Sequence, residues 1–223
     1  MFHDFDFSSI PGAWLLLWQG MATTAWITLI ATLIGLLWGT LLAVVRVAAH
    51  GSWLAWLAAG YVNLFRSVPL VMVILWFYLI VPQLLQALLG TTAHDIRLSS
   101  ALTAFALFES AYYSEIIRAG IQSVPTGQYQ AAMALGMPPA LMWRSIILPQ
   151  AIRRMIPLLL TQAIILFQDV SLVYVIGLSD FFGTAYKIGN RDGRLVELLL
   201  FAGAVYLLLS LSASLLVKRL QNR

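Results

Sequence analysis

Five apolar segments, each about as long as a bilayer is thick, constrain the fold of this 223-residue chain more than any other feature. A transmembrane helix needs about 20 mostly apolar residues, because each residue adds about 1.5 Å and the hydrocarbon core is about 30 Å thick. The segments lie within 14–45 and near 67–89, 98–119, 151–176 and 195–217. The sequence therefore predicts an all-α integral membrane protein with five transmembrane helices.

The composition agrees with a membrane location. Hydrophobic residues make up 61% of the chain and charged residues 10%, whereas soluble domains carry about 25% charged residues. The formal charge of +4 does not indicate nucleic-acid binding, because the basic residues are scattered at the ends of the apolar segments. The chain has no cysteine, which excludes disulfides and thiolate metal sites. We predict no cofactor and no metal ion, and we expect residues 1–223 to form one transmembrane domain without internal repeats.

The distribution of Lys and Arg predicts the orientation of the chain. With the N-terminus outside, nine of the 13 basic residues fall on the cytoplasmic side. The opposite orientation leaves four inside, against the positive-inside bias. We therefore expect a periplasmic N-terminus, a cytoplasmic C-terminus and a cytoplasmic loop over 120–149. A helix near the membrane interface is expected over 52–65, and a longer polar loop outside over 177–194.

The most informative polar stretch, Ser114–Pro149, lies between the third and fourth apolar segments and is too polar to remain in lipid. Its centre reads as an Ala-rich helix that ends at Gly136, and two prolines then force a turn. A short helix held outside the bilayer offers a surface to a partner. The small side chains of Ala131 and Ala132 allow that partner to approach the helix backbone closely.

The spacing of this stretch, Ala-Ala, three residues, Gly, nine residues and Ile-x-Leu-Pro over 131–149, resembles the "EAA" loop of ABC-importer permeases. In that family the loop helix docks into a groove of the nucleotide-binding subunit and transmits its motion. The resemblance implies this coupling role for Gln130, Ala131, Ala132 and Gly136. Gln130 stands where the family usually has Glu, which keeps a hydrogen-bonding group but removes the charge of any ion pair.

Three further stretches carry the same resemblance. Residues 61–70 (YVNLFRSVPL) resemble the entry to the second span in permeases for polar amino acids. Residues 111–120 (AYYSEIIRAG) resemble the Ala-Tyr-x-x-Glu-x-x-Arg-x-Gly motif, and 167–172 (FQDVSL) resemble Lys-Asp-Thr-Ser-Leu. Together the similarity covers nearly all of 20–217, and its closest fit is to permease subunits of bacterial glutamate/aspartate importers.

This resemblance implies the type I ABC importer permease fold, with five spans and a cytoplasmic coupling helix, in the bacterial inner membrane. It also implies the partners: a second permease subunit, an ATP-binding subunit in two copies per complex, and a periplasmic amino-acid-binding protein. The chain lacks a Gly-x4-Gly-Lys-Ser/Thr motif. We therefore expect a non-catalytic subunit. The resemblance implies that it forms half of the translocation pathway, surrounded by membrane lipid, and that it binds no nucleic acid.

Three charged residues near span ends have either a gating or a structural role. Glu115 and Arg118 are three residues apart on a helix, so they share a face and can pair. Such a pair stabilises the inner end of the third span. Arg66 either extends to the membrane interface or contributes to a gate.

Two carboxylates lie within spans, Glu109 near the middle of the third and Asp169 in the outer half of the fourth. An ionisable residue at that depth costs about 2.5–3.5 kcal/mol on insertion scales and normally faces a cavity or a partner. Each carboxylate therefore either lines the translocation pathway or pairs with neighbouring helices. Polar residues of the fourth span that would add pathway contacts are Gln162, Gln168, Ser171 and Tyr174.

The residues and the resemblance favour different substrates. Two carboxylates without a Lys or Arg at the membrane centre suit a cationic or zwitterionic ligand and repel a dicarboxylate. The resemblance favours glutamate and aspartate, whose extra charge must then be met elsewhere, by the second permease subunit, by helix N-termini or by the binding protein. A permease for another polar or cationic amino acid is the alternative.

Two other classes compete with an ATP-driven importer. An ion-coupled secondary transporter is the first, although such proteins often contain inverted repeats and none is visible here. An intramembrane enzyme is the second, and it needs a nucleophile with a base, or metal ligands, inside the bilayer. His3, His50 and His94 lie at or beyond span ends, which leaves no histidine for such a site.

Overall fold

The computed structural model describes residues 5–49, 51–89 and 96–221, and these residues are almost entirely helical. The three histidines lie outside the described residues. The helical elements in chain order, with η1 and η2 as π-helical turns and η3 as a 3₁₀ helix, are α1 (Ser9–Gly12), α2 (Trp14–Ala48), α3 (Trp53–Ser67), α4 (Leu70–Leu75), η1 (Trp76–Ile80), α5 (Val81–Leu89), α6 (Arg97–Gln122), α7 (Thr126–Ala134), α8 (Pro139–Met142), η2 (Trp143–Ile147), α9 (Leu148–Asp169), η3 (Val170–Ile176), α10 (Phe181–Asp192) and α11 (Leu195–Gln221).

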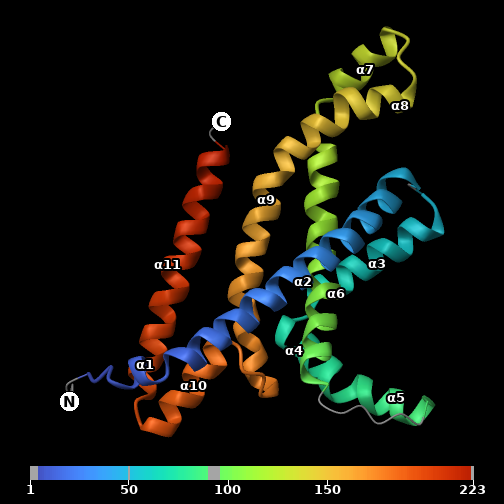
Figure 1. Cartoon of the computed structure of the whole chain (residues 1–223). Helices are drawn as coiled ribbons and strands as arrows, with labels where there is room; N and C mark the ends of the chain where they lie inside the picture. The colour runs from blue at the N-terminus through green and yellow to red at the C-terminus, as the bar shows by residue number, and fades with distance from the viewer. Residues whose placement is uncertain (1–4, 50, 90–95, 222–223) are drawn as a thin grey trace.

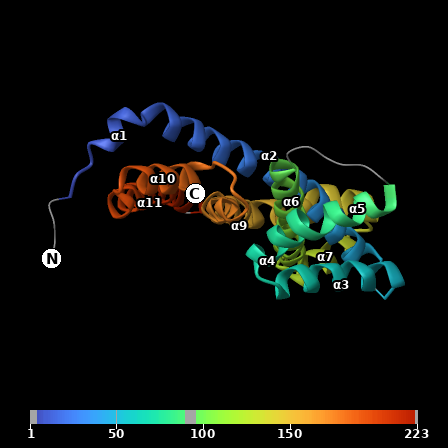
Figure 2. The ribbon, with the colours of Figure 1, turned by 90° about the horizontal axis from the view of Figure 1, so that it is seen from below.

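Figure 1 shows a long helix, α2, that crosses the molecule diagonally and packs along α6. α9 and α11 stand side by side, and α10 packs on α11 and on α2 near the N-terminus. α7 and α8 project at the end of the molecule where α11 also ends, opposite the N-terminus. The view from below separates α10 and α11 on one side from α3, α4 and α5 on the other (Figure 2).

The five predicted spans correspond to α2, α4 to α5, α6, α9 with η3, and α11. By length and apolar composition, three helical stretches of the described chain can cross a membrane: 14–48, 139–176 and 195–221. A fourth counts if α3 and the stretch from Leu70 to Leu84, which meet at a bend of 103°, are one broken span. Composition alone therefore supports fewer spans than the five that we predicted.

The third predicted span, α6, is long enough at 26 residues but is not apolar enough to be counted in this way. It carries Glu109 at its middle and Glu115 and Arg118 in its second half. The reason is its central position: α6 packs against α2, α3, α4 and α9, and more than half of its residues are buried. A helix covered by other helices does not need to present an apolar surface to lipid.

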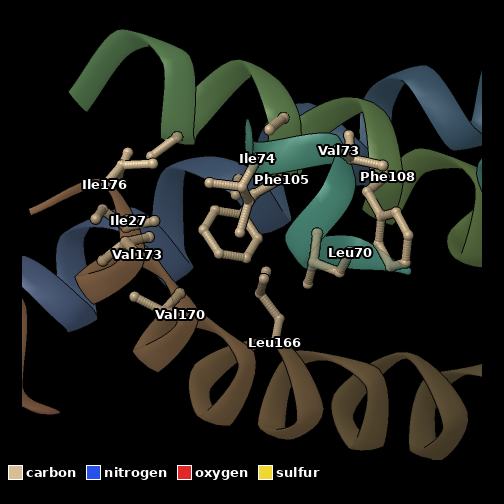
Figure 3. Close-up of a cluster of buried hydrophobic side chains, with 13 residues drawn as sticks. Ile27, Leu70, Val73, Ile74, Phe105, Phe108, Leu166, Val170, Val173 and Ile176 are labelled. Carbon is tan, nitrogen blue, oxygen red and sulfur yellow. The ribbon is translucent and has the colours of Figure 1, made fainter. Parts of the chain in front are cut away.

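The main apolar core lies where α2, α4, α6, α9 and η3 meet. Figure 3 shows Phe105 and Phe108 of α6 beside Val73 of α4, with Leu166 of α9 and Val173 of η3 closing the cluster. A second cluster, which includes Ile117, Ala132 and Ile147, joins the end of α6 to α7, η2 and α9. This second cluster fixes the base of the projecting α7–α8 segment to the bundle.

Small residues bring α2 and α6 into close contact. Ala31, Gly35, Gly39 and Ala43 recur at every fourth position of α2, and all four are buried. A Cβ atom on Gly39 would lie 2.7 Å from the carbonyl oxygen of Ser110 on α6. Stripes of this kind let helix backbones approach closely in membranes, where packing rather than the hydrophobic effect holds helices together.

The prediction of a polar loop over 177–194 is wrong, because most of this segment forms helix α10 (Phe181–Asp192). The Asp180 carboxylate accepts hydrogen bonds from the N–H groups of Phe182 and Gly183, at 3.0 and 2.8 Å, and so caps the helix start. The N–H of Phe181 donates to the Thr24 hydroxyl of α2 at 3.0 Å. Burial raises the pKa of Asp180 to about 6, although these backbone hydrogen bonds lower it.

Candidate functional site

The projecting helix α7 is held to the bundle along one face only. Val124, just before it, and Ala132 on its inner face are buried among residues of α6, η2 and α9. The rings of Tyr129 and Trp143 meet edge to face, with centroids 6.1 Å apart. The opposite face of α7 is open to a partner.

The two alanines of the predicted coupling site point in different directions. Ala131 is exposed, as are Gln130 and Gly136, but Ala132 is 1% exposed and belongs to the core under α7. Successive residues on a helix are about 100° apart, so a pair of neighbours cannot both face the same partner fully. The expectation that a partner approaches the backbone at Ala132 is therefore corrected: its small size fits α7 against its own chain.

Two apolar side chains that we did not predict lie on the open side of this segment. Met133 is 62% exposed and Leu135 is 80% exposed. Both lie outside the helical stretches that are long and apolar enough to cross a membrane. The signal in the sequence was the presence of apolar residues on both faces of a short helix that lies between predicted spans.

Gly136 closes α7 with a left-handed residue. Its φ is +69°, a conformation that costs other L-residues about 1–2 kcal/mol. The N–H of Met137 donates to the carbonyl of Ala132 at 3.1 Å, and the N–H of Gly136 donates to that of Met133 at 2.9 Å. This arrangement ends the helix sharply and sets the direction in which the chain leaves toward α8.

Glu109 lies fully buried in the middle of α6 and is held by α9. The Gln162 amide nitrogen donates to both of its carboxylate oxygens, at 3.3 and 3.1 Å. On the other side, a Cβ on Gly35 would lie 3.1 Å from the Glu109 Cβ. The structure thus brings together two of the predicted pathway residues, and in the single chain it does so between helices rather than at an open surface.

Asp169 is the last residue of α9, where the backbone changes to the 3₁₀ geometry of η3. Asp169 and Ser171 are half-buried, whereas Gln168 is exposed. Tyr174, also exposed, packs against Phe182 and Tyr186 of α10, with ring centroids 5.1 and 5.6 Å apart. The predicted pathway residues of the fourth span are therefore spread along it, and Glu109 with Gln162 forms a separate pair.

The predicted ion pair between Glu115 and Arg118 is present. Arg118 Nη2 lies 2.6 Å from Glu115 Oε2. Arg46 of α2, which we did not predict at this site, donates from Nη1 to Glu115 Oε1 at 2.6 Å. Arg66 Nη1 lies 3.9 Å from the same oxygen, and its guanidinium sits 5.5 Å from the ring centre of Tyr112.

This cluster ties the ends of α2, α3 and α6 together, and it favours the structural role for Glu115 and Arg118. Arg46 is 69 residues from Glu115 in the chain, so no local spacing indicated the contact. Within residues 5–49, 51–89 and 96–221, no group of three His, Cys, Asp or Glu side chains is arranged to hold a metal ion.

Known proteins resemble the chain over its whole length. The family described as "binding-protein-dependent transport system inner membrane component" matches residues 31–223. The glutamate/aspartate import permease protein GltK of Escherichia coli O6:H1 is 59% identical over 222 residues, which cover 99% of each chain. The arginine transport system permease protein ArtQ of Bacillus subtilis is 34% identical, covering 99% of this chain and 97% of that protein.

Solved structures give the same fold. The crystal structure of an amino acid ABC transporter with histidines superimposes with a TM-score of 0.89 at 31% identity, covering 99% of this chain and 100% of that chain. An inward-facing MetNI methionine ABC transporter superimposes with a TM-score of 0.66 at 21% identity, covering 94% and 98%. The second match supports the fold alone.

Proposed function

The chain belongs to the family of inner membrane components of binding-protein-dependent transport systems, and on that premise we propose that it imports acidic amino acids. It is a permease subunit of an ATP-driven importer and forms half of the pathway for glutamate and aspartate. The 59% identity to the glutamate/aspartate permease GltK over 99% of both chains supports this substrate class.

The observation that carries the proposal is the short helix α7, which projects from the bundle with its outer face uncovered. Gln130 and Ala131 are exposed there beside the apolar Met133 and Leu135. An apolar patch outside the lipid-facing surface suits a protein partner. We propose that the cytoplasmic ATPase docks on this face and that the rigid turn at Gly136 passes its motion to α8 and α9.

The remaining partners follow from this role. The complex holds a second permease subunit and two copies of the ATPase, and a periplasmic binding protein delivers the substrate. Residues 1–223 act as one transmembrane domain, with 120–149 as the coupling loop. The ATPase subunit rather than the permease hydrolyses ATP, since the permease sequence has no phosphate-binding loop of the Gly-x4-Gly-Lys-Ser/Thr type.

A cationic amino acid is the second candidate substrate, and a specific observation favours it. Glu109 is buried at the middle of α6, Asp169 is half-buried in α9, and the relative ArtQ is named for arginine. Competitive uptake into vesicles that contain the whole complex separates the two candidates. We expect unlabelled glutamate and aspartate to suppress uptake of labelled glutamate, and glutamine and arginine to leave it nearly unchanged. Uptake of arginine that glutamate does not reduce would contradict the acidic substrate class.

The proposed orientation puts α7 in the cytoplasm and the N-terminus in the periplasm. Single-cysteine labelling tests it cleanly, because the native chain has no cysteine. A Gln128→Cys variant should resist an impermeant thiol reagent added to intact cells and should react once the cells are opened. A Ser179→Cys variant, between η3 and α10, is the matched control and should react from outside. Labelling of the Gln128→Cys variant in intact cells would reverse the assignment.

The Asp169→Asn substitution tests the pathway role of Asp169. The substitution keeps the side-chain volume and hydrogen bonding but removes the charge. Assembly of the complex and basal ATP hydrolysis should therefore persist. Uptake per assembled complex, or the preference among amino acids of different charge, should change severalfold. Pull-down of the complex followed by uptake measurements separates these quantities. Reduced assembly would assign Asp169 a structural role instead, because a partner would lose its counter-charge. Normal assembly with unchanged uptake and selectivity would exclude both the pathway role and the structural role of Asp169.

A further inference from the structure

A hollow of about 470 Å³, lined by residues other than those of α7 and the Glu109–Gln162 pair, contains two arginines and two side-chain amides. It is bounded by the end of α2, one side of α3 and the second half of α6. The residues that line it include Arg46, Ala55, Trp56, Asn63, Arg118 and Gln122.

The charge around this hollow is strongly positive. Arg46 and Arg118 both bind Glu115 at 2.6 Å, and Arg66 lies 3.9 Å from it. Three guanidinium groups thus surround one carboxylate, and the Arg46 side chain is only 14% exposed. Partly buried charge is costly unless it is compensated. The cluster therefore favours the binding of a further anion.

The available donors suit a phosphate group. A guanidinium has five N–H donors, and the hydrogen bond from Arg46 to Glu115 occupies one of them. Gln122 accepts a hydrogen bond from Arg118 at its amide oxygen, which orients its NH₂ group as a further donor. Arginine forks bind phosphate with two parallel hydrogen bonds, and amide donors add to them.

The surroundings of the hollow indicate a lipid. On α3, Trp53 and Trp56 are 69% and 79% exposed, and Leu57 and Leu64 are 62% and 60% exposed. Trp53, Leu57 and Leu64 share one helix face, and Trp56, which lines the hollow, lies on the neighbouring face of α3. Tryptophan is enriched at the level of lipid headgroups, and an exposed leucine row below it can lie against acyl chains.

We propose that this hollow binds the phosphate of an anionic phospholipid from the cytoplasmic leaflet, with the acyl chains along the outer face of α3. Basic pockets between helices on the cytoplasmic side bind such headgroups. The proposal rests on the orientation proposed above, in which the ends of α2 and α6 are cytoplasmic. It assigns the arginine cluster a binding role in addition to tying three helices together.

The test compares lipid retention in purified importer complexes. Complexes are exchanged into detergent that contains equal amounts of phosphatidylglycerol and phosphatidylcholine, and native mass spectrometry counts each bound lipid. The Asn63→Asp variant adds a carboxylate at an exposed position of the hollow and should lower the phosphatidylglycerol count about fivefold relative to the parent, the effect of one charge near an anionic headgroup. The Asn190→Asp variant makes the same change on the exposed side of α10 and should bind both lipids as the parent does.

An independent variant, Arg66→Gln, removes the most exposed of the three cations and should also reduce phosphatidylglycerol binding. Equal retention of phosphatidylglycerol in the parent, the Asn63→Asp variant and the Arg66→Gln variant would overturn the proposal. Displacement of phosphatidylglycerol by inorganic phosphate at matched concentration would also overturn it, because the site would then bind a soluble anion. The measurement needs no transport, so its failure is distinguishable from failure of the proposed function.

Discussion

Substitution of Gly39 by Leu is expected to remove most of the assembled importer from the membrane. A Cβ at this position lies 2.7 Å from the Ser110 carbonyl oxygen and 2.9 Å from the Tyr113 Cβ, and these atoms belong to the backbone and the root of a side chain on α6. They can yield only if α2 and α6 separate. Overpacking of a tight contact costs about 1–3 kcal/mol of stability and sometimes more. We expect the branched side chain of leucine to have a cost near the upper value.

The matched control is Gly203→Leu on α11, since nothing lies within 4 Å of a Cβ there. Both glycines lie within long apolar helices, so the change in apolar content is the same. Thermal unfolding of the purified complex, followed by size-exclusion chromatography, should show a lower midpoint and less intact complex for Gly39→Leu alone. Equal behaviour of the two variants would mean that the α2–α6 contact does not hold the bundle together.

Substitution of Gly136 by Leu is expected to uncouple transport while leaving the spans folded. The residue has a φ of +69°, and a bulky L-residue there costs about 1–2 kcal/mol, which the segment can relieve by changing how α7 ends. The exposed surface of Gln130, Met133 and Leu135 then no longer presents one shape to the ATPase. We expect ATPase co-purification and uptake to fall at least tenfold, with near-normal levels of the permease in the membrane.

The control for this variant is Gly136→Asn, because asparagine tolerates the left-handed conformation better than other non-glycine residues. Its ATPase binding should stay within about twofold of the parent. Similar losses in both variants would point to the added side chain rather than to the turn geometry. Normal ATPase binding and parental uptake in Gly136→Leu would show that this turn takes no part in coupling.

Two of the spans and the coupling helix were predictable because their causes are local. Apolar length indicated α2 and α11 directly, and the Ala-rich run that ends at Gly136 indicated α7. The prediction that Ala132 faces the partner was wrong, because the sequence does not say which face of a short helix meets the core. Its burial depends on Ile147 and Ala151, which lie further along the chain.

Two contacts that were missed join distant residues. Helix α10 has few apolar residues, so it was expected as a loop; its Asp180 cap is local, but the Thr24 hydroxyl that binds the N–H of Phe181 lies far away in α2. Arg46 was counted only as a topology signal, although it completes the cluster around Glu115. Neither contact follows from spacing, because each requires the path of α2 across the whole bundle.

The most direct test of the central claim, that this chain is the permease of an ATP-driven importer, is the energy source of uptake. The complex of permease, partner permease and ATPase is reconstituted into vesicles with the binding protein and labelled glutamate outside. Initial uptake is measured with ATP inside, with a non-hydrolysable analogue inside, and with an imposed ion gradient alone. The account predicts uptake only with hydrolysable ATP and only when the ATPase co-purifies with the chain. Uptake driven by the ion gradient without ATP would contradict it.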